Sequence, residues 1–191
     1  NKAMIARIER PALPREDLEA MGRALSRLQV DNGVAVIHLG EINREDVIPQ
    51  LAEFCLQIEG VDWSVVSGLV KDRVVISVRN VGYVKSAGEI MKRLYDDIGS
   101  AGGHRAMAKA VVPLDRFKQR FGEVSEKVIR EAMLPMIVRS MILSLVRFAS
   151  GLADDEVQGK FEARAEAYES VPGLIEKLYL HYRNGDFGAV Y

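Results

Sequence analysis

The sequence predicts an α/β fold: a small mixed β-sheet of about five strands, flanked by helices and followed by an all-helical C-terminal extension. Short apolar runs of strand length alternate with segments whose apolar residues recur at helical spacing. Beyond residue 122 the apolar periodicity is helical. We therefore expect a linker and an opening helix over 1–31, an α/β domain over 32–121 and a helical extension over 122–191.

The first elements follow from short local signals. Two prolines mark 1–13 as a linker, and apolar residues at helical spacing predict a helix over 15–28. A turn signal at 31–33 precedes a strand over 34–39 that is apolar on both faces, as a buried strand is. His38 lies inside that strand, so we interpret it as a hydrogen-bonded histidine rather than a ligand.

A helix and a hairpin come next. Asn43 is a candidate N-cap for the helix, which Gly60 ends. Cys55 lies on the apolar face of this helix and is interpreted as a buried thiol rather than a nucleophile. Alternating apolar residues predict strands over 62–70 and 73–79, joined by a tight hairpin.

A strand–helix–strand unit occupies the centre of the chain. Ser86 and Glu89 form a capping box for a helix over 87–98, and Gly99 is expected to end it in the left-handed conformation. Small residues alternate along a strand over 106–112. Such a crossover favours a parallel pair with a right-handed connection, although a longer loop before the helix would allow an antiparallel return.

The glycine-rich segment 99–105 is the best candidate for a binding site. Its three glycines let the backbone approach a ligand, and successive N–H groups in such a loop can hold an anion. His104 and Arg105 follow directly, and Arg79 at the end of its strand offers a planar fork for phosphate. A parallel strand pair would separate Arg79 from this loop, whereas an antiparallel pair would bring them together.

Three familiar nucleotide and catalytic loops are excluded by their residue order. No Lys-Ser or Lys-Thr follows the glycines, the order is helix–glycines–strand rather than strand–glycines–helix, and no serine lies between two glycines. The remaining alternative is a glycine-rich helix end with an ordinary loop histidine.

Residues 74–112, with VISVRN, then SAGEIMKRLYDDIG, then SAGGHRAMAKAVV, resemble the C-terminal, substrate-binding domain of the DHH phosphoesterases. The resemblance extends over roughly 15–120. That family carries a Gly-Gly-His loop and an Arg-Ser strand end at these positions. Here Ala101 stands where the family usually has a third glycine, and Asn80 where it often has serine.

The resemblance implies that this chain holds a substrate phosphate through Arg79, Gly102, Gly103, His104 and Arg105. His104 would donate a hydrogen bond rather than act as a nucleophile. The family hydrolyses phosphoesters with divalent metal ions (Mn or Mg) held by an N-terminal domain, and the Asp-His-His triplet of that domain is absent from this sequence. We therefore expect no catalytic residue, metal ligand or cofactor in this segment, which would be inactive by itself as the C-terminal part of a longer enzyme.

The resemblance implies a phosphorylated small molecule or a short single-stranded nucleic acid as substrate: a nucleotide, an oligonucleotide or a polyphosphate. The alternative is a non-catalytic nucleic-acid-binding or assembly module, since related domains end alanyl-tRNA synthetases. A nucleic-acid-binding module is expected to have a basic, aromatic surface, and a net charge of −1 with 7% aromatic residues gives this alternative little support.

The cysteine content and the apolar tail allow three further expectations. A single cysteine excludes an intrachain disulfide and suits a reducing, cytoplasmic location. Two arginines, Arg139 and Arg147, interrupt the apolar run of the tail, so we expect no membrane span. The broad apolar stripe over 124–148 packs either on the α/β core or against a second subunit of a homo-oligomer.

Overall fold

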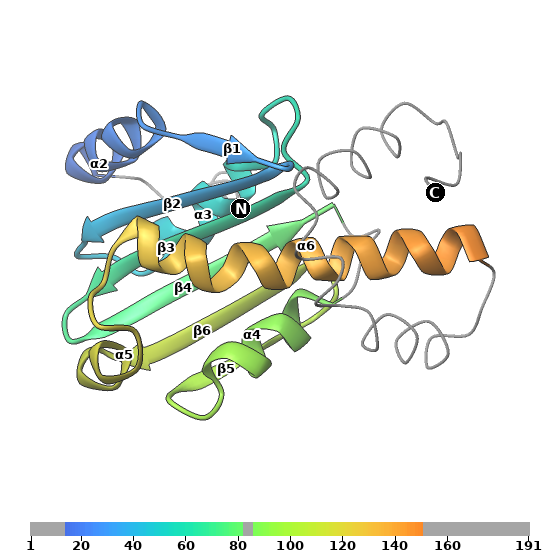
Figure 1. Ribbon diagram of the computed structural model, residues 1–191. Helices are drawn as coiled ribbons and strands as arrows, with labels where there is room; N and C mark the ends of the chain where they lie inside the picture. The colour runs from blue at the N-terminus through green and yellow to red at the C-terminus, as the bar shows by residue number, and fades with distance from the viewer. Residues whose placement is uncertain (1–13, 82–85, 151–191) are drawn as a thin grey trace, which may run out of the picture.

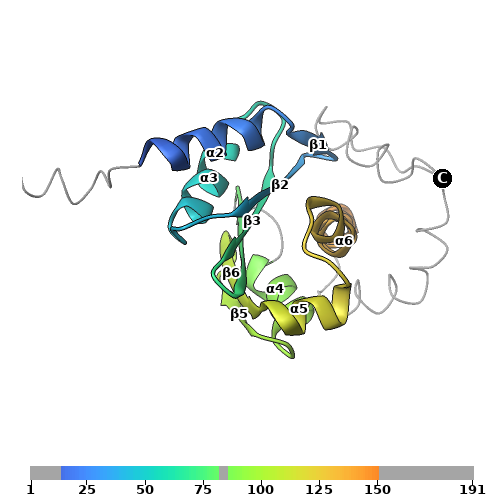
Figure 2. The ribbon, with the colours of Figure 1, turned by 90° about the vertical axis from the view of Figure 1, so that its left-hand side faces the viewer.

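The computed structural model describes residues 14–81 and 86–150 as a mixed sheet between two layers of helices (Figure 1). Helices α2 and α3 cover one face of the sheet, and α4, α5 and α6 cover the other (Figure 2). The predicted fold class is confirmed, with six strands in place of about five. The predicted linker over 1–13, the loop 82–85 and residues 151–191 of the predicted extension lie outside the described residues.

The sheet has the order β1-β2-β3-β4-β6-β5. Only β2 and β3 are parallel, and every other neighbouring pair is antiparallel. The strands are β1 (Gln29–Asp31), β2 (Val34–Glu41), β3 (Trp63–Val70), β4 (Arg73–Asn80), β5 (Ser100–Gly103) and β6 (Met107–Pro113). The described helices are α2 (Arg15–Leu25), α3 (Val47–Cys55), α4 (Ala87–Tyr95), α5 (Leu114–Phe121) and α6 (Glu126–Ser150).

The strand–helix–strand unit corrects the expected direction of pairing. β4 and β6 are antiparallel, not parallel, because the glycine-rich segment forms an additional strand, β5, between α4 and β6. β5 runs antiparallel to β6 at the edge of the sheet, so the chain reverses once more before it pairs with β4. The predicted crossover missed this reversal because four small residues carry no strand-like pattern.

Several predicted helix ends also differ; α2 ends at Leu25 rather than at residue 28, and α3 ends at Cys55 rather than at Gly60. α4 ends at Tyr95, before Gly99, and Gly99 has no positive φ. Glycine is needed there because a Cβ atom would lie 2.5 Å from the carbonyl oxygen of Val111. α3 begins at Val47 after an N-cap at Asp46 rather than Asn43, and no side chain caps it.

The sheet separates two apolar clusters. On the α2 and α3 side, Cys55 is fully buried, as expected. On the other side, Trp63 is fully buried as a packing residue beneath α4, α5 and the first half of α6. The α6 side chains that complete this cluster are Ile129, Met133 and Ile137.

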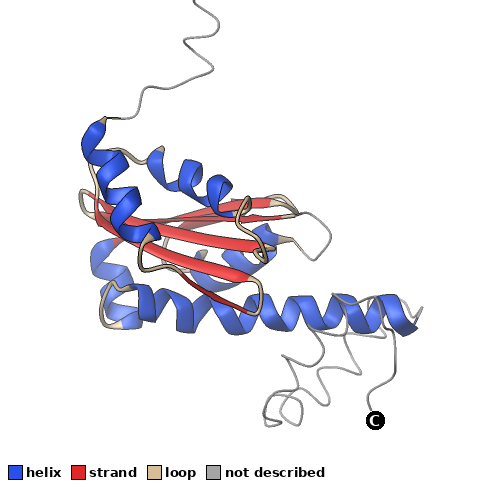
Figure 3. Cartoon of the chain, turned by 90° about the horizontal axis from the view of Figure 1, so that it is seen from above, coloured by secondary structure: helices blue, strands red, loops and turns tan. Residues whose placement is uncertain are grey.

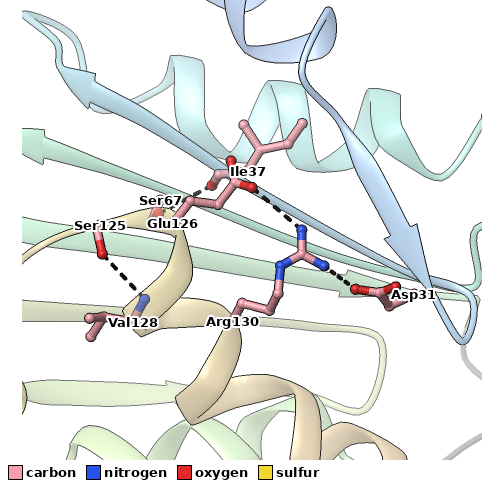
Figure 4. Close-up of polar contacts among 7 residues, drawn as sticks. All are labelled: Asp31, Ile37, Ser67, Ser125, Glu126, Val128 and Arg130. Carbon is pink, nitrogen blue, oxygen red and sulfur yellow. Dashed lines mark hydrogen bonds and ion pairs between the residues drawn. The ribbon is translucent and has the colours of Figure 1, made fainter.

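An ion-pair network fixes the beginning of α6 on the sheet. Arg130 contacts Asp31 of β1 at 2.5 Å and Glu126 of its own helix at 3.4 Å (Figure 4). The hydroxyl of Ser125 accepts a hydrogen bond from the Val128 amide, which caps the helix. The predicted core packing of the tail thus holds for this part of α6, whereas its last turns run beyond the sheet (Figure 3). Within 14–81 and 86–150, no helix is long and apolar enough to cross a membrane.

Candidate phosphate-binding site

The antiparallel pairing brings the end of β4 and the β5–β6 turn to the same end of the sheet. Arg79 lies opposite Met107, and Gly103 lies opposite Ala108. β6 separates β4 from β5, so the backbones of Arg79 and Gly103 are about 10 Å apart, or two interstrand spacings. A parallel pair would have placed Arg79 and the glycine-rich segment at opposite ends of the sheet, and the antiparallel pair places them at the same end.

Asn80 fastens the β5–β6 turn to β4. Its side-chain amide donates a hydrogen bond of 2.9 Å to the carbonyl oxygen of Arg105. Its backbone N–H donates to the carbonyl oxygen of Ala106 at 3.0 Å. The residue is buried, with 5% of its surface exposed. Position 80, which differs from the family pattern, therefore has a structural role that a shorter serine side chain would fill less well.

The start of α4 also holds the turn. The amide of Ala87 donates to the carbonyl oxygen of Arg105, and that of Gly88 donates to that of His104, both at 3.1 Å. These helix amides are already used, so they do not form an anion site of their own. The side chains of His104 and Arg105 remain exposed on the outside of the turn.

The two glycines before His104 differ in what the fold requires of them. A Cβ atom on Gly103 would lie 2.3 Å from the carbonyl oxygen of Met107, and the φ of 154° disfavours other residues. A Cβ atom on Gly102 would meet nothing closer than the Cε of Lys92, at 3.6 Å. Packing thus explains the glycine at 103 but not the glycine at 102.

Arg79 is fixed on one side of its guanidinium group. Nη1 donates to the Ser77 hydroxyl at 3.1 Å and to the Val78 carbonyl oxygen at 3.0 Å. Nε lies 3.4 Å from the carboxylate of Glu53 on α3. Nη2 has no hydrogen-bond partner among residues 14–81 and 86–150, and the side chain is 17% exposed. The edge of a guanidinium group formed by Nε and Nη2 can bind a phosphate in a bidentate manner.

Lys109 is a further candidate residue, which the sequence patterns did not indicate. This residue lies opposite Gly102 in the β5–β6 register and forms an ion pair with Glu45. Strand alternation places Lys109 on the same face as Arg79, whereas its neighbours Ala108 and Ala110 face the α4 side. A single lysine between alanines of an alternating strand was the available signal.

The other two side chains considered as candidates, those of His38 and Cys55, have roles in packing and hydrogen bonding rather than in ligand binding. The Nδ1 of His38 lies 2.9 Å from the Ser67 hydroxyl, and burial lowers the pKa of this histidine, partly offset by Glu126. Burial raises the pKa of Cys55 to about 11. In the described part of the chain, no three His, Cys, Asp or Glu residues lie close enough together to hold a metal ion.

Comparison with known sequences gives the family. The pattern of the DHHA1 domain matches residues 18–131, more than half of the chain, so the chain belongs to the DHHA1 domain family. The resemblance seen in the sequence is thereby confirmed. A relative from Methanocaldococcus jannaschii, named "Uncharacterized protein MJ1633", is 31% identical over 150 residues. That match covers 78% of this chain but only 29% of the relative.

Two solved structures are similar to this chain. An exopolyphosphatase-related protein from Bacteroides fragilis matches 71% of this chain and 39% of its own, with 20% identity and a TM-score of 0.53. This likeness supports the fold. A pGpG-specific phosphodiesterase from Vibrio cholerae matches 64% of this chain and 38% of its own, with 14% identity and a TM-score of 0.42.

Proposed function

We propose that this chain is the substrate-binding domain of a DHH-type phosphoesterase. It holds the phosphate of its substrate at the end of the sheet where β4 finishes and the β5–β6 turn lies. The observation that carries the proposal is the shared position of Arg79 and the Gly102–His104 segment at one sheet end. The membership in the DHHA1 family supports it.

In this proposal Arg79 binds the phosphate through Nε and Nη2, because Nη1 is already engaged. We assign the glycine at 102 to the close approach of a ligand, because a Cβ atom there would make only an ordinary contact with Lys92 and packing does not require a glycine. His104 and Arg105 add donors from the exposed turn. The substrate is a nucleotide, a short oligonucleotide or a polyphosphate.

Hydrolysis itself belongs to a metal-bearing domain outside residues 1–191, where Mn or Mg would activate water. This chain spans 29% of the curated relative and 39% of the exopolyphosphatase-related protein. The activity of the whole protein is therefore part of the proposal. A cytoplasmic location is proposed on the single cysteine, whose thiol is free and buried.

The test is phosphate binding by an Arg79→Ala variant. Each hydrogen bond from a charged group contributes about 1.5–3 kcal/mol, so affinity for inorganic phosphate or a mononucleotide should fall about tenfold or more. Arg120→Ala is the control, since Arg120 forms its ion pair with Asp97, beyond the opposite end of α4. Titration calorimetry should show unchanged affinity for the control, and equal binding by Arg79→Ala would refute the proposed site.

A further inference from the structure

Two cations lie close together on the α3-facing side of the sheet. Arg79 of β4 pairs with Met107 of β6, and Lys109 lies two residues further along β6. Such diagonal neighbours in an antiparallel pair are about 7–8 Å apart, which is within reach of long side chains. Arg79 and Lys109 can therefore contact one ligand.

Both cations are occupied by carboxylates from the α3 region. Glu53 of α3 lies 3.4 Å from Arg79, and Glu45, just before α3, forms the ion pair with Lys109. The Glu53 side chain is 67% exposed, so solvent and salt reach this contact. Exposed ion pairs of this kind contribute little to stability, about 0–1 kcal/mol, so another anion can replace the carboxylate.

This part of the sheet is open. Met107, between the two cations, is 49% exposed, and Gly102 beside Lys109 carries no side chain. Met107 and Lys109 are both exposed, although α3 packs on this face of the sheet. A ligand can thus reach both cations from solvent.

We propose that Arg79 and Lys109 form a two-point site for two neighbouring phosphate groups of one ligand, and that Glu53 and Glu45 occupy the two anion positions until the ligand displaces them. The inference rests on the proposed function and adds Lys109 as the second binding residue. Glu45 then lowers affinity, because its carboxylate competes with the second phosphate. A linear polyphosphate and a 5′-phosphorylated dinucleotide share this chemistry.

The test compares inorganic phosphate with pyrophosphate on the full chain at matched ionic strength, because salt screens exposed charges. Wild-type protein should bind pyrophosphate about tenfold more tightly than phosphate. Lys109→Gln should abolish most of this preference and leave phosphate affinity within about twofold. Glu45→Gln should increase pyrophosphate affinity severalfold. One decade corresponds to about 1.4 kcal/mol.

Lys127→Gln is the matched control, since Lys127 forms an exposed pair with Glu131 on α6, away from the site. Pyrophosphate affinity that is equal in Lys109→Gln and wild type would overturn the two-point site, as would the same loss in Lys127→Gln. The proposed function would survive either result if phosphate binding still depended on Arg79. If phosphate binding does not depend on Arg79, the proposed function itself fails. A 5′-phosphorylated dinucleotide as a third probe distinguishes the two ligand sources: tighter binding than pyrophosphate indicates a nucleic acid, and weaker binding indicates a polyphosphate.

Discussion

At the residue scale, Arg79 combines fixed and open hydrogen-bonding groups. The hydroxyl of Ser77 and the carbonyl oxygen of Val78 hold Nη1, so the orientation of the side chain is set before a ligand binds. Preorganisation of this kind reduces the entropy lost on binding. The exchangeable contact with Glu53 is the part of the environment that a phosphate would replace.

The two glycines of the turn should respond differently to alanine. Gly103→Ala places a Cβ atom 2.3 Å from a carbonyl oxygen, so we expect a loss of about 1–3 kcal/mol in the free energy of unfolding. Gly102→Ala should change stability by less than about 0.5 kcal/mol, while weakening phosphate binding. Urea denaturation and calorimetric titration of both variants check this. Large destabilisation by Gly102→Ala would show that the fold does require this glycine.

His38 should make stability depend on pH. Burial lowers its pKa below the ordinary value of 6.5, so below that pH the unfolded chain takes up this proton more readily than the folded protein. Above about pH 6.5 the contribution of His38 to the free energy of unfolding is fully present. It is lost as the pH falls through the lowered pKa that this histidine has in the folded protein. Urea denaturation at pH 7.5 and 5.5 should show a smaller difference for His38→Gln than for wild type. An identical difference would assign the pH dependence to other groups.

At the scale of elements, α6 is part of the core rather than an appendage. Its buried residues close the apolar cluster over β2 and α4, and Arg130 anchors it to β1 (Figure 4). The apolar stripe in the first half of α6 is therefore accounted for by packing on the sheet and on α4. The sheet and the first half of α6 depend on each other for stability.

Removing one buried side chain of α6 tests this dependence. Met133 is fully buried, so Met133→Ala should lower the free energy of unfolding by about 2–5 kcal/mol. Glu131→Ala, two residues away on the exposed side, should change it by less than about 0.5 kcal/mol. Chemical denaturation of the two variants gives both values. Similar small effects would mean that α6 packs loosely on the sheet.

Local patterns were sufficient for most elements but not for the strand directions. Apolar alternation predicted β3 and β4, and Ser86 was confirmed as the N-cap of α4 by a 3.4 Å hydrogen bond from the Glu89 amide to its hydroxyl. The short strand β5 was missed because its residues, SAGG, have neither alternation nor β-propensity. Pairing direction is a non-local property, and a four-residue strand was enough to reverse it.

The candidate site was predicted in part for the same reason. The glycine loop and Arg79 were evident from residue type and spacing. Lys109 and its glutamate were not, because Glu45 and Lys109 are 64 positions apart in sequence. The anchoring role of Asn80 likewise depends on the antiparallel return of β6.

At the scale of the whole molecule, the chain presents one sheet end with an open, partly charged surface. Arg79, the Gly102–Arg105 segment and Lys109 all lie there, and the described helices leave it accessible. Under the proposed function this chain supplies only one side of the substrate site, so binding by the chain alone should be weak but localised.

The most direct measurement is backbone amide chemical-shift mapping by NMR while a mononucleotide is titrated into the protein. We expect the largest changes to cluster at Arg79, at residues 102–105 and at Lys109, and to saturate together. Changes centred on α6 or on β1, with none at these residues, would contradict a phosphate site at this end of the sheet.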